Sequence, residues 1–100
     1  MAPSLSRGMS FVYVLRLKSG ALYVGCSANV DERFADHSAG KACRTTMIDP
    51  PISVQWIELH PDFAFARKRE AQIKKWSRVK KEALIVGDFS KIRILSRSRD

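Results

Sequence analysis

The sequence predicts an α+β domain with a small, mainly antiparallel sheet of three strands, flanked by helices in the order β-β-α-β-α-α. Three observations support this fold class. Two runs of β-branched and aromatic residues are separated by a tight turn, and a third run lies near the middle of the chain. Three other stretches begin with a residue type that commonly caps a helix. At 100 residues the chain can form one hydrophobic core and not a second.

The first two strands are predicted as a hairpin. Residues 11–17 (FVYVLRL) and 21–25 (ALYVG) are rich in residues that favour strands, and residues 18–20 supply the turn. Strands joined by so short a turn pair antiparallel. A helix should follow, capped within residues 27–29 and ending near Ser38.

One strand and two helices are predicted in the second half. Residues 52–59 (ISVQWIEL) combine alternation with residues that favour a strand. Asp62 is a candidate cap for a helix over residues 63–76. Ser77 is a candidate cap for a further helix over residues 78–86.

The remaining segments lack these signals. Residues 41–51 carry no regular period and two consecutive prolines, which predicts a loop. Residues 1–10 are expected to be a flexible tail. The domain is expected to span residues 11–88, and residues 89–100, with one short apolar alternation, are expected to be a second tail.

Composition excludes several classes of protein. With 45% hydrophobic and 28% charged residues, the chain is neither disordered nor fibrous. No apolar run approaches the ~18–20 residues that a membrane span needs, and residues 1–10 lack the apolar stretch of a signal peptide. Cys26 and Cys43 form no Cys-x-x-Cys pair and are expected to be reduced thiols. We therefore expect a soluble, cytoplasmic protein, associated with the nucleoid if its source is a bacterium.

The formal net charge of +8 is concentrated in residues 51–100, which contribute +6. A basic segment of this strength favours a polyanionic partner such as nucleic acid. The alternative is a solvated helix face, and a membrane-surface role is disfavoured because the helix lacks a broad apolar face. Trp76 is expected in the core, with base stacking as the alternative. The predicted nucleic-acid-binding residues are Arg67, Lys68, Arg69, Lys74, Lys75, Arg78, Lys80 and Lys81.

Glu70 is the only acidic residue between positions 67 and 81. At 100° per residue it falls inside the apolar sector of its predicted helix, about 60° from Ile73. A carboxylate on the inner side of a basic helix can coordinate a hard divalent cation. The alternative is an internal ion pair with Arg69 or Lys74, and the helix alone leaves both interpretations open.

Two further pairs of residues are candidates for a catalytic or phosphate-binding role. Arg33 and His37 lie one turn apart on the same face of a predicted helix. Arg33 could hold a phosphate or be an ordinary surface residue, and His37 could be a hydrogen-bonded core histidine. Tyr13 and Tyr23 lie on the two strands of the hairpin, where tyrosines serve in cross-strand packing or as proton acceptors.

Taken in order and spacing, these motifs resemble the GIY-YIG nuclease superfamily, and the small stand-alone members most closely. The resemblance spans about residues 11–85. Phe11 stands where the name-giving glycine would be, and Val12 and Val24 replace isoleucines. The residues that carry the resemblance are Tyr13, Tyr23, Gly25, Arg33, His37 and Glu70.

The resemblance implies a metal-dependent endonuclease that hydrolyses phosphodiester bonds. Tyr13, Tyr23, Arg33 and His37 would be catalytic, and Glu70 would hold one divalent ion, Mg²⁺ or Mn²⁺. Gly25 would be a structural residue of the second motif. The expected substrate is DNA rather than RNA, with selection by nucleic-acid structure or by a protein partner, in repair or recombination. The alternative is a nucleic-acid-binding module that keeps the nuclease fold without catalysis.

Overall fold

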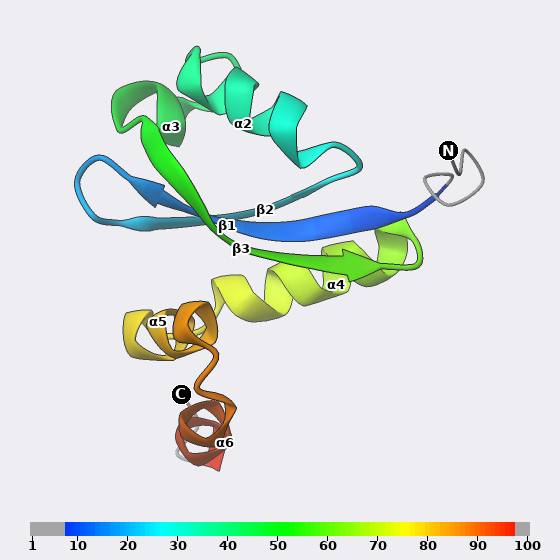
Figure 1. Ribbon diagram of the computed structural model, residues 1–100, viewed down its shortest axis with the longest axis vertical. Helices are drawn as coiled ribbons and strands as arrows, with labels where there is room; N and C mark the ends of the chain where they lie inside the picture. Colours follow the sequence, from blue (N-terminus) through cyan, green and yellow to red (C-terminus); the bar gives the residue numbers. More distant parts are fainter. Residues whose placement is uncertain (1–7, 98–100) are drawn as a thin grey trace.

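The computed structural model describes residues 8–97, which form a three-stranded antiparallel sheet with helices on both faces (Figure 1). The strands are β1 (Ser10–Leu17), β2 (Leu22–Ser27) and β3 (Pro51–His60), in the order β2-β1-β3. β1 is therefore the central strand, and β2 and β3 are the two edges of the sheet. The predicted α+β fold class is confirmed.

Helices lie on the two faces of this sheet (Figure 1). One face carries α2 (Val30–Ser38) and α3 (Arg44–Ile48). The opposite face carries α4 (Phe63–Lys74) and α5 (Arg78–Val86), and α6 (Phe89–Arg97) packs against α5. Among the described residues, no helix is both long and apolar enough to cross a membrane.

The caps that the sequence predicts are present. Asp62 accepts a hydrogen bond from a backbone amide of the first turn of α4, and Ser77 does the same for α5. Within residues 27–29, Asn29 is the residue that caps α2. Gly87 ends α5 with a φ of +76°, a left-handed conformation that favours glycine.

Alternation along β1 divides its side chains between two hydrophobic clusters, one on each face of the sheet. The cluster beneath α4 and α5 consists of Val12, Val14, Val24, Ala66, Ile73 and Leu84. The cluster beneath α2 consists of Tyr13, Leu15, Leu17 and Val30. Because β1 is covered on both faces, its side chains cannot change face without exposing one of the clusters.

Two short helices lie where the sequence predicts none. Residues expected to be a loop contain α3, which has no side-chain cap at Cys43 and therefore gives no start signal. Residues expected to be a tail contain α6, whose first turn is capped by Asp88. Phe89 of α6 meets Trp56 edge to face, with the ring centroids 6.3 Å apart, so tertiary packing stabilises this helix. Most of the expected N-terminal tail, residues 1–7, lies outside the described residues, while Ser10 is already buried in β1.

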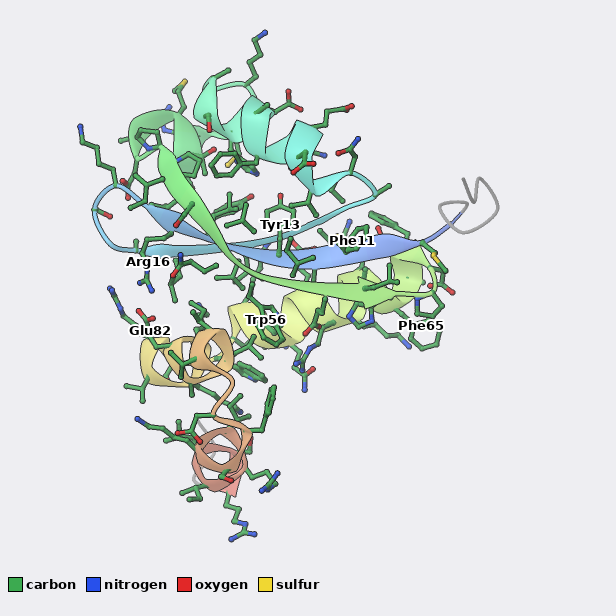
Figure 2. The ribbon with its side chains drawn as sticks, viewed as in Figure 1. Phe11, Tyr13, Arg16, Trp56, Phe65 and Glu82 are labelled. Atoms are coloured by element: carbon green, nitrogen blue, oxygen red, sulfur yellow. The ribbon has the colours of Figure 1, made fainter. Side chains whose placement is uncertain are left out.

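Arg16 and Glu82 join the sheet to α5 (Figure 2). Arg16 Nη1 and Nη2 each donate to one oxygen of Glu82 over 2.7 Å, which is the paired geometry that arginine forms with a carboxylate. The hydrogen bonds from Arg16 lower the pKa of Glu82 below its ordinary value of 4.5. This pair fixes the position of α5 relative to the central strand.

We predict that Glu82→Gln lowers the free energy of unfolding by about 1 kcal/mol, because a partly exposed pair contributes no more than this. Arg16→Met should have a similar effect. In urea unfolding, the double variant should lose less unfolding free energy than the sum of the losses in the two single variants. The contribution of this ion pair to the free energy of unfolding should be present above pH 4.5. It should decrease as the pH falls and Glu82 becomes protonated. Lys68→Gln, at an exposed position of α4, is the control; strictly additive costs for the pair would contradict the prediction.

Candidate active site

A small cavity lies along β2, at the edge of the sheet that α2 and α4 approach from opposite faces. Its volume is about 160 Å³. It brings together every residue that the sequence singles out as catalytic or metal-binding, although their roles stay predictions. The residues that line it are Tyr13, Tyr23, Gly25, Cys26, Arg33, His37, Ala42 and Glu70.

Gly25 makes room for the Tyr13 ring. The two residues are opposite each other in the β1–β2 pairing, and Tyr13 extends toward the face that carries α2 (Figure 2). A Cβ at position 25 would lie 2.6 Å from Tyr13 Cζ and 3.0 Å from Cε1, closer than non-bonded carbon atoms can approach. The glycine of the second motif is therefore required by the close approach of the tyrosine ring.

Tyr13, His37 and Thr46 form a buried chain of hydrogen bonds. The Tyr13 hydroxyl lies 3.0 Å from His37 Nε2, and His37 Nδ1 lies 2.7 Å from Thr46 Oγ1. Their exposed fractions are 3%, 1% and 0% respectively. Burial, followed by the neighbouring Tyr23, raises the pKa of Tyr13 above its ordinary value of 10. Burial and the charge of Arg33 lower the pKa of His37 below its ordinary value of 6.5, so both side chains favour their neutral forms.

Tyr23 and Arg33 complete the side of the cavity nearest α2. The Tyr23 ring meets His37 edge to face, with centroids 4.9 Å apart. Burial and the Cys43 thiol raise the pKa of Tyr23 to about 12. Arg33 is partly exposed, and it lines both this cavity and a larger adjoining one of about 550 Å³ that contains Phe63. The guanidinium is thus placed where the site opens to larger molecules.

Glu70 enters the cavity from α4, and its side chain is 13% exposed. The Cys26 thiol donates to Oε1 over 3.2 Å, and Lys74 Nζ lies 2.8 Å from Oε2. The ion pair that the sequence left open as an alternative is therefore formed with Lys74 and not with Arg69, which instead donates to Glu58 over 2.7 Å.

Within the part of the chain that the structure describes, Glu70 is the one carboxylate that lines the cavity, and a carboxylate is a ligand that suits a hard divalent cation. Among residues 8–97, no group of three or more His, Cys, Asp and Glu side chains could hold a metal by itself. Mg²⁺ commonly binds through one or two carboxylates, with water and substrate phosphate as its other ligands. One carboxylate in a cavity that also contains Arg33 matches that pattern.

The basic segment is not uniformly exposed. Arg69 and Lys80 lie on the Trp76 ring, with Arg69 Cζ 5.1 Å and Lys80 Nζ 4.5 Å from its centroid. Lys80 is only 4% exposed, contrary to its predicted role in contacting phosphates, and Trp76 packs against the core as expected. Lys81 is partly exposed. The exposed members, called here the basic surface, are Arg67, Lys68, Lys74, Lys75 and Arg78.

Cys26 and Thr46 contact the site residues, but the sequence did not single them out as members of the site. Cys26 follows Gly25 directly, and this position next to the second motif could have identified it as a site residue. Thr46 comes from α3, within the predicted loop, and only the tertiary fold brings it to His37.

We predict that Gly25→Ala destabilises the fold by about 1–3 kcal/mol, the usual cost of overpacking. The cost arises from the overlap with Tyr13, so the same change should cost much less in a Tyr13→Ala background. Urea unfolding of the four variants of this cycle measures both values. An equal cost in the two backgrounds would show that the tyrosine is not what requires glycine.

Comparisons with known proteins identify relatives of this chain. Residues 9–83 match the model of the GIY-YIG catalytic domain. A UPF0213 protein of Staphylococcus haemolyticus is 35% identical over 75 residues, which cover 75% of this chain and 92% of that protein. A UPF0213 protein of Natronomonas pharaonis is 36% identical over 78 residues, which cover 78% of this chain and 92% of that protein.

A solved structure is similar as well. The solution NMR structure of a UPF0213 protein from Bacillus halodurans superposes with a TM-score of 0.51 at 32% identity, covering 78% of this chain and 83% of that one. The family model alone extends over the whole sheet, the cavity and most of α5. The chain therefore belongs to the GIY-YIG family of nucleases.

Proposed function

We propose that this protein is a metal-dependent endonuclease that hydrolyses phosphodiester bonds in DNA. The observation that carries the proposal is the convergence of two tyrosines, an arginine, a histidine and a glutamate on one cavity. Membership of a nuclease family makes nucleic acid the substrate class. DNA as the substrate, activity in repair or recombination, and a cytoplasmic location are further parts of the proposal.

Arg33 would bind the scissile phosphate. Its planar guanidinium can donate two parallel hydrogen bonds to phosphate oxygens. A donor directed at the charge that develops during hydrolysis contributes about 10²–10³ in rate. The partly exposed position of Arg33, between the small cavity and the larger one, supports this role.

Tyr13 would accept a proton from the attacking water, and His37 and Tyr23 would orient this water. Proton transfer by a positioned side chain contributes typically about 10²–10⁴ in rate. The hydrogen bond between the Tyr13 hydroxyl and His37 Nε2 fixes the direction of the hydroxyl, and the Tyr23 ring packs edge to face on the imidazole.

Glu70 would hold one Mg²⁺ or Mn²⁺, as GIY-YIG nucleases generally use a divalent ion. When bound, the ion neutralises charge on the phosphate and on the leaving oxygen. In the structure Glu70 is paired with two side chains of its own helix, with Lys74 Nζ 2.8 Å from Oε2 and Arg67 Nε 3.7 Å from Oε1.

The basic surface would follow the phosphate backbone. Contacts of lysine and arginine with phosphates give affinity that decreases steeply with salt and carries little base specificity. Arg67 belongs both to the basic surface and to the larger cavity beside Glu70, so a bound backbone would lead directly to the site.

We predict that Glu70→Gln and Arg33→Met each lower the rate of Mg²⁺-dependent cleavage by about 10²–10³. Because Gln keeps the shape of Glu and loses its charge, Glu70→Gln should still bind DNA. The assay uses nicked, flapped, branched and single-stranded substrates with Mg²⁺, Mn²⁺ or EDTA. Glu32→Gln, on the exposed face of α2, is the matched control.

Cleavage by Glu70→Gln at the wild-type rate would refute the role of this carboxylate. Binding without cleavage of any substrate by the wild-type protein would instead favour the non-catalytic binding module.

A further inference from the structure

Thr46 lies at the inner end of the hydrogen-bonded chain that leads to the cavity. Its side chain is fully buried, and Oγ1 lies 2.7 Å from His37 Nδ1 and 3.4 Å from Cys43 Sγ. On the other side of the imidazole, Nε2 lies 3.0 Å from the Tyr13 hydroxyl. Every member of this chain can donate or accept, so the placement of one proton determines the others.

A neutral imidazole has one N–H donor and one acceptor nitrogen. If Nδ1 carries the proton, it donates to Thr46, and Nε2 accepts the phenol proton of Tyr13. If Nε2 carries the proton, it donates to the Tyr13 oxygen, and Thr46 must donate to Nδ1. Tyr13 is therefore the hydrogen-bond donor in the first tautomer of His37 and the acceptor in the second.

Either atom of the Cys43–Thr46 pair can be the donor, and the first arrangement is the one in which the Cys43 sulfur accepts from the Thr46 hydroxyl. A hydroxyl that donates to sulfur keeps its lone pairs available for His37 Nδ1–H. Burial raises the pKa of the Cys43 thiol, but hydrogen bonds with Thr46, the Tyr23 hydroxyl and the Thr45 backbone together outweigh it and leave the pKa below its ordinary value of 9.0.

We propose that Thr46 is a positioning residue that holds the proton of His37 on Nδ1, so that Nε2 accepts the phenol proton of Tyr13. The short helix α3, which lies in a segment without sequence periodicity, then serves to position His37. The helix supplies the Thr46 hydroxyl that fixes the tautomer, and Cys43, the residue directly before the helix, supplies the sulfur that directs this hydroxyl.

The consequence for catalysis rests on the proposed function. As the oxygen of the attacking water bonds to phosphorus, the water gives a proton to the Tyr13 oxygen, and Tyr13 gives its phenol proton to His37 Nε2. The bond from phosphorus to the leaving oxygen breaks, and that oxygen takes a proton from solvent. His37 later returns its extra proton to solvent through Tyr13. Because burial raises the pKa of Tyr13, a phenolate is scarce at neutral pH, and this relay avoids forming one. Burial and Arg33 lower the pKa of His37, so the protonated imidazole is only a transient carrier of the proton.

Nitrogen-15 NMR of the imidazole rings reports the tautomer without metal or nucleic acid. We expect the wild-type protein at neutral pH to carry the His37 proton on Nδ1. Thr46→Val keeps the shape of the side chain and removes the hydroxyl, so it should move the proton to Nε2, whereas Thr46→Ser should keep it on Nδ1. His60, the second histidine of the chain, is the internal control and should not change.

With an active substrate, Thr46→Val should lower kcat about 10²-fold with little change in KM, and Thr46→Ser should stay within a few-fold of the wild type. A purely structural role of Thr46 would not switch the tautomer. Cys43→Ala is a second test, because loss of the sulfur frees Thr46 to donate to Nδ1 and should also move the proton to Nε2.

A wild-type proton on Nε2, or an unchanged tautomer in both Thr46→Val and Cys43→Ala, would overturn the proposal. A wild-type proton on Nδ1 that moves in these variants would support it even in a protein that cleaves no nucleic acid, a result that would refute only the proposed function.

Discussion

The site depends on the close approach of Tyr13 to Gly25. Tyr13 lies on the central strand, paired on both sides, so its ring cannot move away without disturbing the sheet. The position opposite has no Cβ, and the ring occupies the space that one would fill. From there the hydroxyl reaches His37 of α2, and His37 reaches Thr46 of α3. A single missing side chain thus determines how one face of the sheet meets its helices and where a cavity remains at the edge.

Burial divides the site into an uncharged part and a charged part. Tyr13, His37 and Thr46 are almost inaccessible, and burial shifts the pKa of Tyr13 upward and that of His37 downward, so both are neutral. Arg33 and Glu70 lie where the cavity opens, next to the larger one. Phosphodiester hydrolysis needs both parts, since protons are moved best by groups that can be neutral, whereas phosphate and a divalent ion need opposite charges. The sheet edge provides both because α2 and α4 approach it from opposite faces.

Much of this arrangement could be predicted from the sequence because it is encoded locally. The hairpin and the capped helices follow from periodicity and capping, and motif spacing singles out Tyr13, Tyr23, Gly25, Arg33, His37 and Glu70 among the residues of the cavity. The errors arise where tertiary contacts decide. Residues 91–95 (KIRIL) alternate as in a strand, but Phe89, Ile92 and Leu95 also recur at helical spacing, and the contact of Phe89 with Trp56 stabilises the helix α6. Thr46 has no local signal, and its role depends on a partner nine positions away. Lys80 counts as a surface charge in composition, yet it is buried over the Trp76 ring.

The central claim is that Glu70 and the Tyr13 chain belong to one metal-binding site at the β2 edge of the sheet. Paramagnetic broadening by Mn²⁺ in NMR spectra of the nitrogen-15-labelled protein tests it most directly, because broadening falls off with distance from the ion. The account predicts that the signals lost first are those of Gly25, Cys26, Arg33 and Glu70, which come from three separate elements and meet only at the cavity. Broadening centred on another carboxylate, such as Glu58 or Asp49, would contradict it.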